Sequence, residues 1–411
     1  MSDLSLTLPR GVAWRRTLGY YALFICLGLG LAIFGPTLPS LAAQVHTSLA
    51  NMGLLFLFSA SGYSLGTLVS GRVLDRVRGH PVLGIAQLTV AVVLFLFPSV
   101  PSLELLLGLV ACKGFAEGFV NNGANLLLIW THGRKVSPFL NGLHFFFGLG
   151  AFLAPFLVAQ GMSTSAGYQG VYRILAAFML AVGLVLLFLP DSPVPVHTAS
   201  GRGEASGSVR AHLPLVLAAA LFLFFYVGSE MTFSGWVYTY ATVLGLASAA
   251  GAAYLTSVFW LSFTLSRLVS IPAATRLRPR QILPVLLVGC LALLGLGLAF
   301  PGSRTVLWLM AAGLGFCMGP IWPTGFNLVG QSLEMTGRIS SIILLGDSLG
   351  NMVLPWLVGQ VIGAAGARAM VFLIAGSMLL TGAAYGAILR LRAIQPSNDE
   401  ENAKMQSPRS G

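Results

Sequence analysis

The chain is built from long apolar segments separated by short polar breaks. Each segment approaches the ~20 apolar residues that a helix needs to cross a membrane. Twelve such segments predict an all-α integral membrane protein with twelve transmembrane helices. The predicted spans are 18–41, 49–71, 81–99, 102–128, 138–160, 170–190, 213–240, 247–268, 281–300, 304–328, 339–361 and 369–390.

One long polar break divides the chain into two halves. Residues 191–212 (DSPVPVHTASGRGEASGSVRAH) are rich in Pro, Ser and Gly, which is typical of a linker. The predicted units are a cytoplasmic N-terminal tail (1–17), a six-helix bundle (18–190), a cytoplasmic linker (191–212), a second six-helix bundle (213–390) and a cytoplasmic C-terminal tail (391–411).

The composition excludes most other classes of protein. Hydrophobic residues make up 56% of the chain and charged residues only 9%, against roughly 25% charged residues in soluble domains. A soluble enzyme or a nucleic-acid-binding protein could not cover its surface with so few charges. The sequence shows no P-loop, no catalytic constellation and no metal-ligand spacing. We therefore expect no enzymatic activity, no cofactor or metal and no nucleic-acid partner.

The basic residues are distributed unevenly between the two sides of the predicted bundle. With the N-terminus in the cytoplasm, only Arg173, Arg304 and Arg368 fall on the outer side, and Lys113 lies inside a helix. This distribution predicts that both termini are cytoplasmic. The net charge of +11 then belongs to the cytoplasmic face, where contact with anionic lipid is expected. Short loops favour a bacterial inner membrane. We also expect a monomer.

The two halves repeat each other at an offset of 200 residues. An internal repeat of six helices is typical of transporters whose two bundles rock about a site near the membrane midplane. It predicts two bundles related by pseudo-two-fold symmetry. The matching pairs include Gly28 with Gly228, Gly35 with Gly235, Arg76 with Arg276, Gly150 with Gly350 and Pro155 with Pro355.

The loop after the second span reads Gly71-Arg-Val-Leu-Asp75-Arg76-Val-Arg-Gly79-His80. It resembles the G-x-x-x-D-R-x-x-G-[RK] signature of the major facilitator superfamily. The resemblance implies that Asp75 caps a helix and pairs with an arginine, holding the cytoplasmic side closed in the outward-open state. In the second half Ile271 replaces the first glycine and Thr275 the aspartate, while Arg276 remains.

Three further segments resemble the sugar-transporting branch that contains the fucose:proton symporters and the sodium-dependent glucose transporter-like proteins. They are Asn121-Asn-Gly-Ala-Asn125, Leu143-His144-Phe-Phe-Phe-Gly148 and Tyr226-Val-Gly-Ser-Glu230 through Gly235-Trp236. The resemblance covers residues 18 to about 390 and implies site roles for Glu230 and His144. Asn121 stands where this branch usually has an acid, and Glu117 lies one turn earlier. Coupling to a proton, to sodium or to no ion therefore stays open.

Polar side chains inside membrane spans are costly and tend to mark function. Amides suit ligands with many hydroxyl groups, and aromatic walls suit the apolar faces of sugars. Each candidate also has a structural alternative, in which it hydrogen-bonds to a neighbouring helix or packs in the core. The predicted substrate-binding residues are Glu230, Asn121, Asn122, Asn125, Trp236, Trp322, Asn327, His144 and Tyr226.

A second group is predicted to couple or gate transport. Lys113 and Glu117 are spaced to pair on one helix face, although an ion pair that only holds the bundle together is an equal alternative. Gly228 and Gly235 flank Glu230 and are expected to let their helix bend. The predicted coupling or gating residues are Glu117, Lys113, Asp347, Asn351, Asp75, Arg76, Gly71, Gly79 and Arg276.

These observations predict a secondary transporter that moves a small polar solute by alternating access, with a sugar as the first candidate. The alternative within the same superfamily is a multidrug or lipid efflux protein, against which the asparagine cluster argues. A membrane sensor or scaffold without transport activity is a third alternative.

Overall fold

The computed structural model describes residues 10–189, 212–331, 333 and 335–394. Within these residues every regular element is a helix. Most of the predicted tails, and the predicted linker apart from His212, lie outside the described residues, so their boundaries stay predictions.

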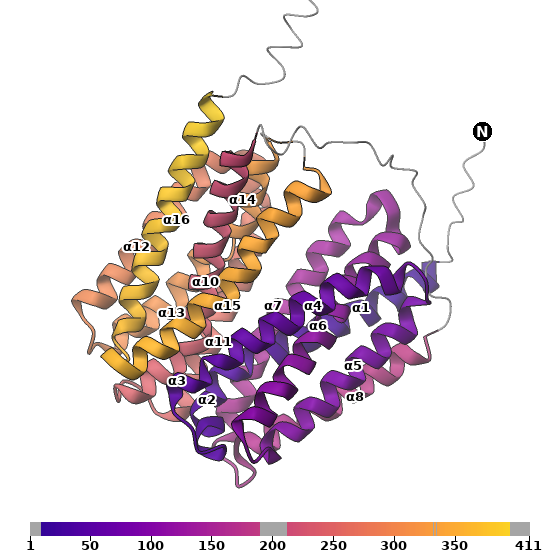
Figure 1. Cartoon of the computed structure of the whole chain (residues 1–411), viewed down its shortest axis with the longest axis horizontal. Helices are drawn as coiled ribbons and strands as arrows, with labels where there is room; N and C mark the ends of the chain where they lie inside the picture. The colour runs from indigo at the N-terminus through magenta and orange to yellow at the C-terminus, as the bar shows by residue number, and fades with distance from the viewer. Residues whose placement is uncertain (1–9, 190–211, 332, 334, 395–411) are drawn as a thin grey trace, which may run out of the picture.

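The first half of the chain contains eight α-helices and two short 3₁₀ turns in the order of the sequence (Figure 1). They are α1 (Arg10–Ala32), α2 (Phe34–Gln44), α3 (Leu49–Met52), α4 (Leu54–Leu74), α5 (Gly79–Leu96), η1 (Phe97–Ser99), α6 (Leu103–His132), η2 (Gly133–Lys135), α7 (Ser137–Gly161) and α8 (Gly167–Leu187).

The second half contains seven helices over its described residues. They are α10 (Leu213–Val243), α11 (Ala249–Arg276), α12 (Pro279–Ala299), α13 (Arg304–Met318), α14 (Ile321–Gly330), α15 (Gly337–Ala365) and α16 (Ala369–Ile394).

Each predicted span corresponds to one helix or to a consecutive pair of helices. In the described part of the chain, ten helical segments are long and apolar enough to cross a membrane, and the bent pair α1–α2 makes an eleventh. Helix α6 is 30 residues long but less apolar, because it carries Lys113, Glu117 and Asn121. The prediction of an all-α membrane protein is confirmed.

Proline accounts for the break in two of the interrupted spans. Helices α1 and α2 meet at an angle of 50°, where Pro36 lacks the N–H that would continue the helix. Helix α13 ends at Met318 and α14 begins at Ile321, after Gly319 and Pro320. Helix α10 runs without a break through Gly228 and Gly235, the two glycines that are expected to let it bend.

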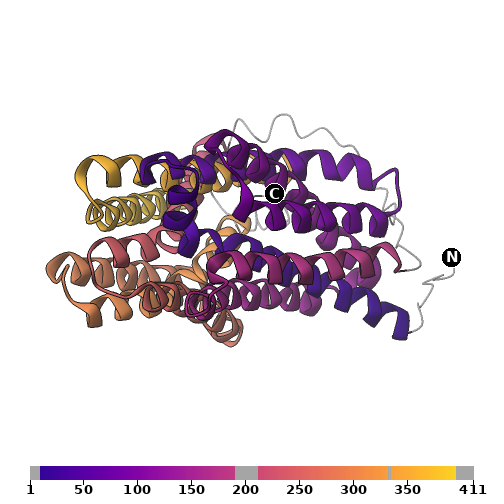
Figure 2. The ribbon, with the colours of Figure 1, turned by 90° about the horizontal axis from the view of Figure 1, so that it is seen from below.

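The helices form two bundles that lie beside each other (Figures 1 and 2). The internal repeat appears as equivalent close contacts in both bundles. Gly150 of α7 packs on the backbone carbonyl of Ile25 in α1, and Gly350 of α15 packs on that of Phe224 in α10. A Cβ at either glycine would collide with the carbonyl, so only glycine permits these helices to approach so closely.

The bundles touch on one side of the molecule and separate on the other (Figure 1). On the closed side, α2 packs on α10, α3 and α4 pack on α15, and α7 packs on α11. The open side carries the α4–α5 turn, the α11–α12 turn and the end of α16. Arg78 and Arg280 are exposed there, so the open side is the arginine-rich side, which the sequence analysis predicts to be cytoplasmic.

Candidate functional site

A cavity of about 530 Å³ lies between the two bundles. Leu277, Pro279 and Ile282, at the α11–α12 turn, line its mouth on the open side. Its walls come from α1, α4, α6 and α7 in the first half and from α10, α11, α14 and α15 in the second. Six of the predicted site residues line it, namely Asn121, His144, Glu230, Trp322, Asn327 and Asp347.

Glu230 and Tyr226 lie one turn apart on α10, so both side chains are on the same face. The Tyr226 hydroxyl oxygen is 2.6 Å from Oε2 of Glu230 and 2.6 Å from the carbonyl oxygen of Met318. Glu230 lines the cavity, whereas Tyr226 is fully buried behind it. Tyr226 therefore connects the acid to the end of α13 and does not line the cavity as predicted for a binding residue.

Arg267 of α11 also lines the cavity, and the sequence analysis did not include it among the site residues. Its Nε donates to the carbonyl of Gly319 at 3.1 Å, and its guanidinium lies 4.5 Å from the ring centroid of Phe263. The Gly319 carbonyl lacks its helical donor because residue 323 is a proline. The signal was available, since an arginine inside the predicted span 247–268 is unusual, but it was counted only as a topology marker.

Trp322 and Asp347 form the wall contributed by α14 and α15. The Trp322 indole donates to Oδ1 of Asp347 at 3.0 Å, and its ring stacks on Phe326 at 5.2 Å. Asn327 lines the same wall, just over one turn further along α14. This wall combines an aromatic face with a carboxylate and an amide, a combination that suits a hydroxylated ligand.

The opposite wall comes from the first half. Asn121 of α6 lies beside Tyr63 of α4, and both line the cavity. His144 of α7 packs edge-on against Phe24 of α1, with ring centroids 6.0 Å apart. Tyr63 and Asn141 are further polar lining residues that the sequence analysis did not single out. Nothing in their local sequence distinguishes them from packing residues.

Three more predicted binding residues make structural contacts away from the cavity. Asn122 donates to the hydroxyl of Ser70 at 2.8 Å, and Asn125 donates to the backbone carbonyl of Asn121 at 2.8 Å. Trp236 is completely buried on the closed side, where its indole donates to the carbonyl of Pro355 at 2.9 Å. These contacts support helix packing in this conformation.

Lys113 and Glu117 form the only ion pair among the described residues, with Nζ 2.7 Å from Oε1. Both side chains are buried within α6 and line neither the central cavity nor the small void on the closed side. Lys113 lies 4.7 Å from the ring centroid of Phe34, at the start of α2. The absence of a side chain at Gly30 of α1 makes room for the pair, because a Cβ there would lie 2.5 Å from Oε1 of Glu117. The pair is therefore placed against the bend between α1 and α2.

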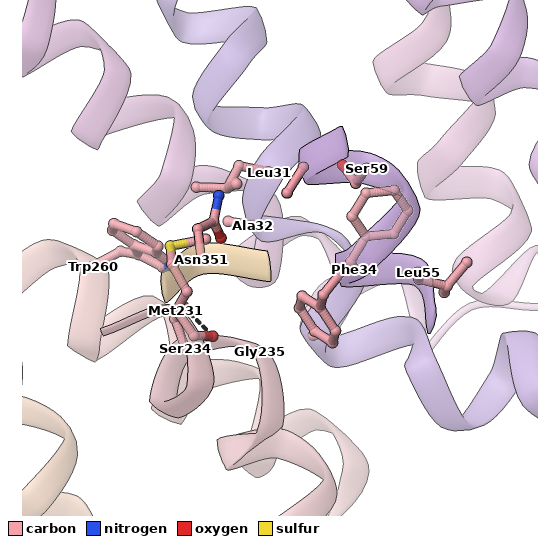
Figure 3. Close-up of a pocket in the computed structure, with 13 residues that line it drawn as sticks. Leu31, Ala32, Phe34, Leu55, Ser59, Met231, Ser234, Gly235, Trp260 and Asn351 are labelled. Carbon is pink, nitrogen blue, oxygen red and sulfur yellow. Dashed lines mark hydrogen bonds between the residues drawn. The ribbon is translucent and has the colours of Figure 1, made fainter. Parts of the chain in front are cut away.

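The closed side contains a small void of about 40 Å³ between the bundles (Figure 3). Phe34 and Ser59 from the first half face Met231 and Ser234 from the second. Asn351 of α15 lines this void, one turn beyond Asp347, which lines the central cavity. Helix α15 therefore runs from the cavity into the closed region.

The predicted gating loop lies on the open side. Asp75 and Arg76 are exposed in the α4–α5 turn, and Asp75 does not cap α5, whose N-cap is Arg78. Gly79 packs tightly against Leu127 of α6. The remaining two residues, Gly71 and Arg276, lie near the end of α4 and at the end of α11. Among the described side chains, Asp75 forms no ion pair with an arginine in this open form.

A family model described as Major Facilitator Superfamily matches residues 20–350. The chain therefore belongs to this superfamily, whose members are membrane transporters of small molecules and not enzymes.

Curated relatives place the resemblance more narrowly. The chain is 28% identical to mouse sodium-dependent glucose transporter 1A over 95% of this chain and 100% of the relative. It is 28% identical to human sodium-dependent glucose transporter 1 over 82% of this chain and 72% of the relative.

Two solved structures share the fold. A mutant of the nucleoside transporter NupG superimposes with a TM-score of 0.75 at 15% identity, covering 92% of this chain and 99% of that chain. A bacterial homologue of the human lysosomal transporter Spinster, in an inward-facing and unoccupied conformation, gives 0.73 at 12% identity and covers 94% and 98%.

Proposed function

We propose that this protein is a secondary transporter of a sugar that works by alternating access. The observation that carries the proposal is the chemistry of the central cavity. Amides from Asn121, Asn141 and Asn327 face it together with the carboxyl groups of Glu230 and Asp347. Such groups can donate to and accept from several hydroxyls of one ligand. The names of the mouse and human relatives support a sugar as the substrate.

We further propose that the form described here is open to the cytoplasm. The cavity opens toward the arginine-rich side, and the positive-inside rule supports a cytoplasmic location for that side. Anionic lipid is the expected contact for these arginines. The bacterial setting and the monomeric state stay predictions, and the two relatives named above are from mouse and human.

The test is thermal stabilisation of the purified protein by a panel of hexoses, deoxyhexoses and nucleosides, with and without sodium. Saturable stabilisation by one sugar, lost in Glu230→Gln, is the expected result. Glu104→Gln is the matched control, because Glu104 is an exposed acid at the start of α6. Stabilisation by none of the sugars, with the variant correctly folded, would overturn the sugar assignment.

An efflux function for apolar compounds is the second candidate. Phe24, Phe145 and Ile271 give the cavity an apolar portion in addition to its polar one. Stabilisation by hydrophobic cations or lipids in the same assay, unaffected by Glu230→Gln, would favour this function.

A further inference from the structure

The hydroxyl group of Tyr226 makes two short oxygen–oxygen contacts but has only one proton to donate. Its hydroxyl oxygen is 2.6 Å from Oε2 of Glu230 and 2.6 Å from the carbonyl oxygen of Met318. Both distances are those of O–H···O hydrogen bonds. A phenol has one proton to donate, and a backbone carbonyl has none. If Glu230 were ionised, one of the two short contacts would join two oxygens without a hydrogen between them.

A proton on Glu230 satisfies both contacts. The carboxylic acid then donates to the Tyr226 oxygen, and the Tyr226 hydroxyl donates to the Met318 carbonyl. The chain of donors runs from α10 to the end of α13, and every polar atom in it is paired. Tyr226 is completely buried, so water cannot replace either partner from the tyrosine side.

The Met318 carbonyl requires this donor because of the break in its span. Helix α13 ends at Met318, and no described backbone hydrogen bond outside the helices ends on the Met318 carbonyl. The next carbonyl, that of Gly319, accepts a hydrogen bond from Nε of Arg267. Two consecutive carbonyls at the break are therefore satisfied by side chains that come from α10 and α11.

We propose that Glu230, Tyr226 and the Met318 carbonyl form a proton-binding site, with Glu230 protonated while the cavity is open and Tyr226 acting as a positioning residue. When the proton leaves to water in the cavity, Tyr226 donates to the carboxylate and the Met318 carbonyl loses its donor. The state of the proton is thereby linked to the geometry of the α13–α14 break. Its use as the coupling ion rests on the proposed transport function; the site itself does not.

The charged and titratable groups around the site come from several helices. Arg267 of α11 and Asp347 of α15 line the same cavity as Glu230, and His144 of α7 lines it from the other bundle. Cys290 of α12 lies near Tyr226. Neither Arg267 nor His144 forms an ion pair with Glu230 in this form. Arg267 is the cation positioned to approach Glu230 once the carboxyl group ionises.

The test is infrared spectroscopy of the full-length protein at neutral pH, because a protonated carboxyl group has a C=O stretch that a carboxylate lacks. We expect Glu230→Gln to remove one such band and Asp347→Asn to leave that band in place. Glu104→Gln is the control for an exposed acid. Tyr226→Phe retains Glu230 and should shift its band to higher frequency, because the acid loses its acceptor.

Two results would overturn the proposal. One is an infrared spectrum of Glu230→Gln that keeps every C=O band of a protonated carboxyl group. The other is a Glu230 C=O band that does not shift in Tyr226→Phe. The Tyr226→Phe measurement keeps the test decisive if Glu230→Gln does not fold. Neither measurement requires a sugar. If the C=O band of Glu230 responds as expected but no sugar stabilises the protein, the proton site is supported and the proposed substrate is rejected.

Discussion

The buried pair of Lys113 and Glu117 shows how the effect of one residue depends on its partner. The two side chains are 1% and 8% exposed, so neither charge is solvated by bulk water. The desolvation of two buried charges offsets much of their attraction, whereas removing one partner leaves an unpaired charge. The pair therefore need not stabilise the fold strongly, although each member requires the other.

This reasoning predicts a non-additive double-mutant cycle. Lys113→Met and Glu117→Gln should each lower the free energy of unfolding by about 3–5 kcal/mol, and the double variant should recover most of that loss. Thermal unfolding of the purified protein in detergent measures the three changes. Additive losses would mean that the two residues do not act as a pair.

Two tryptophans that the sequence analysis grouped together are predicted to differ in effect. Trp322→Phe removes the hydrogen bond to Asp347 in the cavity and should weaken sugar binding about three- to tenfold. Trp236→Phe removes the bond to Pro355 on the closed side, so it should alter the balance between conformations with little change in the intrinsic site. Isothermal titration calorimetry measures the change in sugar binding, and distance measurements between the bundles report the balance between conformations. Trp308→Phe, at an exposed position on α13, is the control.

Only part of the site could be predicted at the residue scale. The polarity of Asn121 and Asn122 marked both as candidates, yet Asn121 lines the cavity and Asn122 bonds to Ser70. Consecutive helical residues point about 100° apart, so the rotation of each helix decides which residue faces the cavity. That rotation is set by packing against neighbouring helices, as with α6 against α4, and not by local sequence.

At the scale of the helices, the break between α13 and α14 organises one wall of the site. Pro320 and Pro323 remove two helical donors, and side chains from α10 and α11 supply donors to the carbonyls of Met318 and Gly319. A broken helix at the centre of a transporter exposes backbone groups where it lines a cavity. Here the break also fixes the position of Arg267.

A variant that restores a backbone donor tests this link. Pro323→Ala provides an N–H that can reach the Gly319 carbonyl, so Arg267 is no longer its only donor. We expect Arg267→Gln to cost about 1–3 kcal/mol of stability in the natural background and clearly less in the Pro323→Ala background. The measurement is a thermal double-mutant cycle.

Pro272→Ala is the control for the loss of a helical proline, because Pro272 lies within α11 and is not part of the α13–α14 break. Equal costs of Arg267→Gln in the Pro323→Ala and natural backgrounds would show that the Gly319 carbonyl does not hold Arg267.

The break itself was predictable because Gly319, Pro320 and Pro323 occur close together within one apolar segment. Gly228 and Gly235, which were expected to let their helix bend, lie in an unbroken α10 and admit neighbouring groups. A Cβ at Gly228 would collide with Leu354, and one at Gly235 would meet the ring of Phe56 at 2.6 Å. Sequence alone does not show whether a helical glycine allows a bend or a close approach.

At the scale of the whole molecule, the closed side is held by backbone-to-backbone contact between the halves. The repeat-related residues Gly35 and Gly235 meet there, since a Cβ on Gly35 would lie 2.8 Å from the Ser234 carbonyl and 3.1 Å from that of Gly235. Gln360 also donates to the carbonyl of Ala50 at 2.8 Å. The symmetry that the repeat predicted thus places equivalent glycines on both sides of one interface.

The last prediction follows from that contact. Gly35→Ala inserts a methyl group against immobile backbone atoms of α10 only while this side is closed, so it penalises the form described here relative to an outward-open form. We expect about a tenfold change in the ratio of the two forms, which corresponds to about 1.4 kcal/mol. Gly108→Ala is the matched control, since a Cβ at this α6 glycine meets nothing within 4 Å.

Spin-label distances across both sides measure the change. Labels at Arg78 and Arg280 report the open side, and labels at Thr164 and Gly302 report the closed side; all four positions are exposed. In Gly35→Ala the first distance should shorten in the same fraction of molecules in which the second lengthens, because rigid bundles that rock about a central site move both sides together. A closed side that loosens while the Arg78–Arg280 distance stays constant would show that the two sides open independently, and alternating access would then need a mechanism other than rigid rocking.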